Sequence, residues 1–119
     1  MKEDNIVRQK SYAFALRIIK LYKFLCENKR EYVLSKQILR CGTSIGANIE
    51  EAIGAQSKKD FNAKMTIAYK ESRETHYWLR LLKDSDYLTE NEFNSILADC
   101  EELLKIIGSI IKTLKKKEV

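Results

Sequence analysis

The chain has 119 residues, and among them are no proline and only four glycines. Proline breaks helices and glycine weakens them, so few residues here would interrupt a long helix. Leucine, lysine, glutamate, alanine and isoleucine are the abundant residues instead. The composition therefore predicts an all-α fold, and the length predicts one domain over residues 1–119.

Long apolar runs are absent as well. No run of about 18 apolar residues occurs, so the sequence predicts no membrane-spanning helix. The first ten residues, MKEDNIVRQK, lack the apolar core of a signal peptide. We therefore expect a cytoplasmic protein that does not associate with a membrane.

The residues that build catalytic and metal centres are scarce. His76 is the only histidine, and the sequence has no Glu-x-x-His pair, no Gly-x-Ser-x-Gly motif and no phosphate-binding glycine loop. The three cysteines, Cys26, Cys41 and Cys100, include no Cys-x-x-Cys pair, which favours reduced thiols in a core. We therefore expect no enzymatic activity, no metal, no cofactor and no small-molecule substrate.

Apolar residues at steps of three and four predict four helices. The expected helices cover residues 5–27, residues 34 or 35 to 52 or 54, residues 57–84, and residues 89 to the C-terminal lysines. Short turns join them, which is typical of an up-down-up-down antiparallel four-helix bundle. Ser35 is the expected N-cap of the second helix and Gly54 its C-terminal stop. Ser57 with Asp60 opens the third helix, and a capping box at 89–92 opens the fourth.

Two of the expected helices carry more apolar surface than one bundle core needs. The first helix has one stripe at Tyr12, Ala15, Leu16, Ile19, Tyr22 and Cys26, and an adjoining stripe at Phe14, Ile18, Leu21 and Leu25. The fourth has a main seam at Phe93, Leu97, Cys100, Leu104, Ile107, Ile111 and Leu114, and a parallel stripe at Ile96, Leu103 and Ile110. This surplus predicts a homo-oligomer. Gly42 and Gly46 in the second helix predict close approach of a neighbouring helix.

Three charged residues, Glu50, Arg73 and Glu74, lie next to apolar seam positions. An unpaired buried charge is costly, so we expect ion pairs or hydrogen bonds between helices, for instance Arg40 or Arg73 with Glu50 or Glu74. A ligand-binding role for them is the alternative. On the third helix, Tyr69, Tyr77 and Trp78 can stack on bases, or they can pack in a core or an interface.

The positive charge is uneven along the chain. Residues 1–83 contain 17 basic and 9 acidic side chains, and residues 84–119 contain 5 and 8. The expected basic face consists of Lys10, Arg17, Lys20 and Lys23 on the first helix with Lys36 and Arg40 on the second. Such a face predicts contacts to nucleic-acid phosphates, or it is a solvated surface without a partner. If this face binds no RNA, Lys58, Lys59 and Lys64 are the next candidates.

Motifs between residues 34 and 74 also resemble those of a known family. The run L-x-x-Q-I-x-R-x-G-x-S-I-x-A-N-I-x-E, with S-K-K-D-F and A-x-x-E-S-x-E after it, is similar to the proteins encoded in intervening sequences of bacterial 23S ribosomal RNA genes. The matching residues are Gln37, Ile38, Arg40, Ser44, Ile45, Asn48, Ile49, Glu50, Ser57, Asp60, Phe61, Ala68, Ser72 and Glu74. The family commonly has Glu-Gly where this chain has Glu50-Glu51, so here Gly54 is expected to end the helix.

The resemblance covers nearly the whole chain and implies a four-helix bundle that assembles into a pentamer. A related branch, the accessory variability protein of diversity-generating retroelements, engages a reverse transcriptase and its template RNA. The sequence therefore leads to a non-enzymatic, homo-oligomeric bundle that binds RNA or a nucleic-acid-handling partner. A purely structural or protein-interaction module is the alternative.

Overall fold

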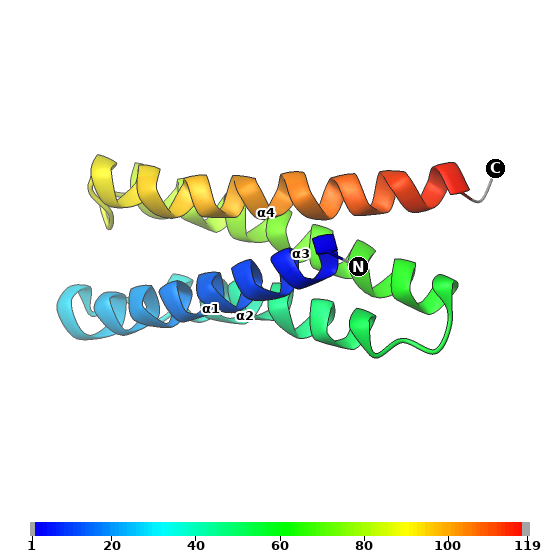
Figure 1. Cartoon of the computed structure of the whole chain (residues 1–119). Helices are drawn as coiled ribbons and strands as arrows, with labels where there is room; N and C mark the ends of the chain where they lie inside the picture. The colour runs from blue at the N-terminus through cyan, green and yellow to red at the C-terminus, as the bar shows by residue number, and fades with distance from the viewer. Residues whose placement is uncertain (1, 118–119) are drawn as a thin grey trace.

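The computed structural model consists of four helices that run alternately in opposite directions (Figure 1). The helices are α1 (Lys2–Lys29), α2 (Leu34–Ile53), α3 (Lys58–Asp84) and α4 (Glu90–Lys117). Each packs against two neighbours in the cyclic order α1, α2, α3, α4. The structure describes residues 2–117, with side chains from residue 5 onward, so residues 1, 118 and 119 of the expected domain lie outside it. The prediction of an all-α antiparallel four-helix bundle is confirmed.

Two of the helix starts follow the local signals of the sequence. At the start of α3, the backbone N–H of Asp60 donates to Ser57 Oγ over 3.0 Å. At the start of α4, Thr89 N–H donates to Glu92 Oε1 over 2.9 Å, and Glu92 N–H donates to Thr89 Oγ1 over 3.2 Å. Both caps satisfy amides that have no partner within the helix.

The start of α2 differs from the prediction. Ser35 lies inside the helix and is not its N-cap. The carboxylate of Glu31 accepts the N–H groups of Val33, Leu34 and Ser35 over 3.1, 3.0 and 2.7 Å instead. Burial alone would raise the pKa of Glu31, but these three donors outweigh it and hold the pKa below the ordinary value. A longer acidic side chain before the helix therefore replaces the expected serine cap.

The end of α2 also takes a different form from the one expected. Gly54 directly follows the helix with φ −87°, so it does not adopt the left-handed conformation that a C-terminal stop glycine commonly has. Its N–H still donates to the carbonyl of Glu50 over 3.2 Å. The helix therefore ends at the expected place through an ordinary right-handed turn.

Only one of the two apolar stripes of α1 is buried in the core. Phe14, Ile18 and Leu25 are buried together with Leu21. Three members of the other stripe face outward: Tyr12 is 66% exposed, Leu16 49% and Ile19 36%. A single chain therefore leaves part of the apolar surplus of α1 uncovered.

The surplus on α4 is covered within the chain. The buried residues of α4 combine parts of both expected stripes, namely Phe93, Ile96, Cys100, Leu103, Ile107 and Ile110. The rest of the expected main seam, Leu97, Leu104, Ile111 and Leu114, is half-buried against this core. The core-facing side of α4 is thus rotated from the predicted seam toward the parallel stripe.

The two interior glycines of α2 have different surroundings. A Cβ atom added to Gly42 would lie 2.7 Å from Cγ1 and 2.8 Å from Cγ2 of Ile18 on α1. A Cβ atom added to Gly46 would meet the carbonyl oxygen of Ser11 at 3.5 Å, an ordinary contact distance. The predicted close approach therefore occurs at Gly42, and Gly46 has room for a methyl group.

Two of the three thiols lie in the middle of the bundle, as predicted. Cys41 on α2 and Cys100 on α4 are both fully buried, and Cys26 is half-buried. Burial raises the pKa of Cys41 to about 11 and that of Cys100 to about 12. Both central thiols are therefore protonated and unreactive at neutral pH.

Candidate functional site

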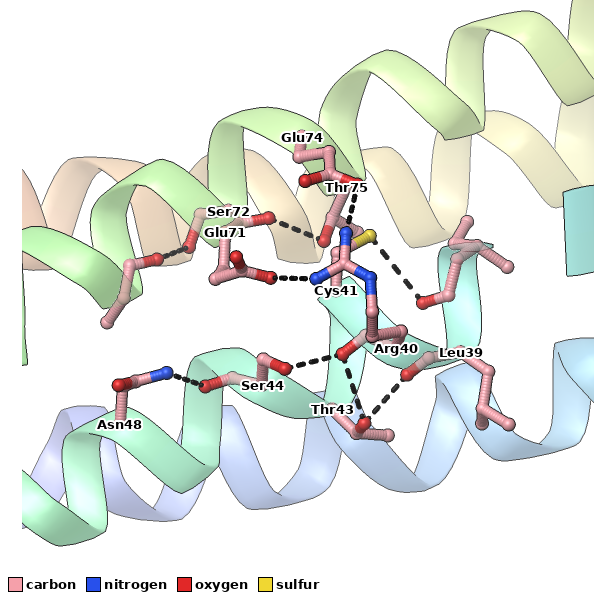
Figure 2. A network of polar contacts seen from close by, with 12 residues as sticks. Leu39, Arg40, Cys41, Thr43, Ser44, Asn48, Glu71, Ser72, Glu74 and Thr75 are labelled. Carbon is pink, nitrogen blue, oxygen red and sulfur yellow. Dashed lines mark hydrogen bonds and ion pairs between the residues drawn. The ribbon is translucent and has the colours of Figure 1, made fainter. Parts of the chain in front are cut away.

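A polar network crosses the interface between α2 and α3 (Figure 2). From here on, a seam is the interface between two neighbouring helices. Arg40 on α2 extends toward α3, where its guanidinium binds Glu74 and also Glu71 Oε2, the latter over 3.2 Å. Trp78, one turn after Glu74, donates its indole N–H to Glu74 Oε2 over 2.9 Å. One carboxylate thus accepts hydrogen bonds from a helix on each side of the seam.

The network holds its charges in place. The hydrogen bond to Glu74 raises the pKa of Arg40 above its ordinary value. The hydrogen bonds from Trp78 and Arg40 lower the pKa of Glu74. Both groups stay ionised at neutral pH, so neither is poised to exchange a proton. The arrangement joins α2 to α3 through charged hydrogen bonds, which favour one alignment of the two helices.

The other two residues of the expected polar set have different surroundings. Glu50 accepts from Arg8 on α1 over 2.7 Å, a pairing that the sequence analysis did not consider. Arg73 is exposed and makes no ion pair with the side chains of residues 5–117. Of the pairings left open by the sequence, the structure contains Arg40 with Glu74.

Three of the six residues of the expected basic face are neutralised by carboxylates. Arg40 binds Glu71 and Glu74, as described above. Lys10 binds Glu102 over 3.1 Å, and Arg17 Nη1 binds Asp99 Oδ2 over 2.7 Å. Both of these pairs join α1 to α4.

The remaining members of the basic face are Lys20, Lys23 and Lys36. All three are exposed and make no ion pair within the described part of the chain. The sequence could not show this division, because Arg17 and Asp99 are 82 positions apart. Of the next candidates, Lys64 pairs with Glu51 over 3.0 Å, whereas Lys58 and Lys59 are exposed.

An apolar groove lies between α1 and α2 on the outside of the bundle. It has a volume of about 160 Å³. Its walls are Arg8, Ser11, Tyr12, Ala15, Thr43, Gly46, Ala47 and Glu50. The groove continues the exposed stripe of Tyr12, Leu16 and Ile19, which share one side of α1 at steps of four and three. The core of the single chain leaves this outer apolar face uncovered.

The three aromatic side chains of α3 that the sequence offered for base stacking separate into two groups. Tyr69 and Trp78 are partly buried against the core, so their rings are used in packing. Tyr77 is 46% exposed and meets Trp78 edge to face, with ring centroids 5.1 Å apart. Of the three, Tyr77 is the ring that remains accessible for stacking.

Neither a metal cluster nor a membrane helix is present in the described residues. No three His, Cys, Asp or Glu side chains between residues 5 and 117 come together as metal ligands would. Within residues 2–117, every helix falls short of the length and apolarity needed to cross a bilayer.

Fold and contacts define an antiparallel four-helix bundle whose seams are bridged by ion pairs and whose first helix exposes an apolar stripe. The chain belongs to the family of 23S rRNA-intervening sequence proteins, whose family model matches residues 3–109. A solved structure from Bacteroides thetaiotaomicron VPI-5482, described as a protein of unknown function from the S23 ribosomal protein family, is 55% identical. It superposes with a TM-score of 0.91 and covers 92% of this chain and 98% of its own. No curated protein matches the chain.

Proposed function

We propose that the chain is a cytoplasmic, non-enzymatic scaffold that assembles with copies of itself and binds RNA. Self-assembly is supported by the stripe of Tyr12, Leu16 and Ile19, whose apolar side chains are exposed in the single chain. Fully burying one large apolar side chain contributes roughly 1.5–3 kcal/mol, and covering these partly exposed side chains in every subunit contributes a fraction of that each, which favours association. The five-fold number is taken from the family resemblance.

The RNA-binding part is supported by the charge that remains after the ion pairs form. The chain has 22 basic and 17 acidic side chains, a net charge of +5. Several carboxylates are already engaged, among them Asp99, Glu102 and Glu74 between helices and Glu31 at a helix start. The exposed lysines and arginines thus outnumber the carboxylates left to neutralise them. In a ring, every such contact repeats once per subunit and weak contacts add through multivalency.

A second candidate function is a protein-interaction module without RNA. The neutralisation of Lys10, Arg17 and Arg40 favours it, because half of the expected basic face is occupied by carboxylates of the same chain. In this alternative the apolar groove between α1 and α2 is the functional surface, and the charge only keeps the protein soluble.

A salt titration separates the two candidates. Binding of a fluorescently labelled 20-nucleotide oligo(U) is measured by anisotropy between 25 and 300 mM KCl, and the mass of the assembly by light scattering. If RNA binds, the affinity falls with salt at a log–log slope of about −0.7 per phosphate contact. Absence of binding at 25 mM KCl contradicts the RNA proposal and leaves the interaction module. A mass near that of one 13.9 kDa chain contradicts the assembly proposal.

A further inference from the structure

The four seams of the bundle differ in how their cations are neutralised. Three seams are each crossed by an ion pair between a basic residue and a carboxylate. These pairs are Arg8–Glu50 between α1 and α2, Arg17–Asp99 between α1 and α4, and Arg40–Glu74 between α2 and α3. At the α3–α4 seam, the one pair in the described residues joins Glu101 to His76, which is charged only when protonated.

Two contacts define which sides of α3 and α4 face each other. His76 Nε2 lies 3.3 Å from Glu101 Oε2. About two turns away on both helices, the ring of Tyr69 lies against Gly108, where an added Cβ would be 3.4 Å from Tyr69 Cε2. The α3 side that contains Tyr69 and His76 therefore faces the α4 side that contains Glu101 and Gly108.

Basic residues occupy these two sides along most of their length. On α3, Arg73 lies between Tyr69 and His76, and Arg80 follows His76 by one turn. On α4, Lys105 lies between Glu101 and Gly108, and Lys112 and Lys115 follow at helical spacing. Lys70 follows Tyr69 directly and lies about 100° further around α3, next to this side rather than on it. Together these are six exposed cations on or next to the two sides: Lys70, Arg73, Arg80, Lys105, Lys112 and Lys115. Within residues 5–117, none of the six is in an ion pair.

The exposed ring on this side of the bundle is Tyr77. The guanidinium carbon of Arg80 lies 5.9 Å from the centroid of the Tyr77 ring, and Trp78 supports the ring from its edge. A half-exposed aromatic ring among cations is what single-stranded nucleic acids bind, because phosphates need positive charge and unpaired bases stack on flat rings. A duplex offers no free base to such a ring.

We propose that the α3–α4 seam binds single-stranded nucleic acid, with phosphates along the two rows of cations and a base stacked on Tyr77. The proposal rests on the proposed RNA-binding function and gives that function a site. The site differs from the basic face expected from the sequence, which lies on α1 and α2. From Lys105 to Lys115 the row on α4 extends about 15 Å along the helix axis.

The test compares two charge-matched double variants in the full chain. Arg73→Gln with Lys112→Gln removes one cation from each row, and Lys20→Gln with Lys23→Gln removes two from the α1 face. Labelled 20-nucleotide oligo(U) is titrated by anisotropy across a range of KCl concentrations. We expect the first variant to lose at least tenfold in affinity at 100 mM KCl and its salt slope to fall by about 1.4. The second variant should show a smaller loss.

A stacking test uses a second matched pair. Tyr77→Ala should weaken oligo(U) binding roughly tenfold and leave the salt slope unchanged, because stacking releases no counterions. Tyr32→Ala, which removes an exposed tyrosine from the α1–α2 turn, is its control. Circular dichroism and light scattering establish that each variant folds and assembles like the wild type. If the Arg73 and Lys112 variant does not assemble, Lys70→Gln with Lys105→Gln replaces it.

The outcomes separate this site from the general RNA proposal. Wild-type protein that binds no oligo(U) at 25 mM KCl overturns both. Wild-type binding that survives Arg73→Gln with Lys112→Gln but weakens with Lys20→Gln and Lys23→Gln overturns the α3–α4 site and keeps RNA binding. Tighter binding of a 20-base-pair RNA duplex than of oligo(U) overturns the single-strand assignment. A selective loss in the α3–α4 variants and in Tyr77→Ala supports the site.

Discussion

Replacing Gly42 by alanine should destabilise the protein, although alanine is the better helix former. The new methyl carbon would lie 2.7, 2.8 and 3.0 Å from Cγ1, Cγ2 and Cδ1 of Ile18. Real carbon contacts of this kind are about 3.5–4.0 Å long. Ile18 is fully buried and branched at Cβ, so turning it about χ1 moves one γ carbon away but brings another group near.

The magnitude follows from two opposing effects. Overpacking a well-packed core costs typically about 1–3 kcal/mol. Alanine regains about 1 kcal/mol of helix propensity relative to glycine. The net loss for Gly42→Ala is therefore about 0–2 kcal/mol. Gly46→Ala on the same helix meets only ordinary contacts and should gain about 1 kcal/mol, which makes it the matched control.

Urea unfolding at one fixed protein concentration measures both changes, because an assembling protein has a concentration-dependent stability. A double-mutant cycle with Ile18 assigns the cause. Ile18→Val keeps both close γ carbons and should not relieve Gly42→Ala. Ile18→Ala removes them, so in that background Gly42→Ala should become stabilising by about 1 kcal/mol. Equal stability gains for the two glycine variants would refute the close contact between Gly42 and Ile18.

Three further changes probe other parts of the molecule. Glu31→Ala leaves three amides at the start of α2 without their acceptor and should cost about 2 kcal/mol in urea unfolding. Because the folded pKa of Glu31 is lowered, this contribution should be complete above pH 4.5 and disappear as the pH falls further, so wild type and variant should converge in acid. Leu16→Lys should reduce the assembled mass in light scattering while circular dichroism stays helical, and an unchanged mass would exclude the stripe from the interface. A disulfide reagent at pH 8 should modify Cys26 quickly and Cys41 and Cys100 only after denaturation, since burial keeps the latter two protonated.

The fold was predictable because the signals for it are local. Steps of three and four place the apolar residues of α3 on one side, and Met65, Ala68, Ser72 and Leu79 are all buried there. The caps at Ser57 and at 89–92 depend only on residues within one turn. Local signals do not decide which side of α1 faces the core, because both of its stripes are apolar. The sequence of α1 does not decide between them, whereas in the structure Gly42 on α2 leaves the room that Ile18 of the buried stripe occupies.

The surface chemistry was less predictable because it depends on register between distant helices. Arg17 looks like a free cation in the sequence, and only the packing of α1 on α4 brings Asp99 to it. Arg73 looks like a partner for Glu50 or Glu74, yet its side chain is exposed and pairs with neither. The cap by Glu31 was missed although it had a local signal, since an acidic residue shortly before a helix favours its positive end.

The contacts between helices are unequal, and this has a consequence for how the bundle opens. α2 and α3 share the most extensive contact, whereas α1 and α4 share the least and are joined by the Lys10–Glu102 and Arg17–Asp99 pairs. The α1–α4 seam can therefore open first. The hairpin of α1 and α2 and the hairpin of α3 and α4 then remain joined through the α2–α3 contact, which acts as a hinge. An opened hairpin can exchange between neighbouring copies, which makes domain swapping a route to entangled assemblies. Because salt screens surface ion pairs, amide exchange along α1 and α4 should accelerate with KCl before exchange between α2 and α3 does.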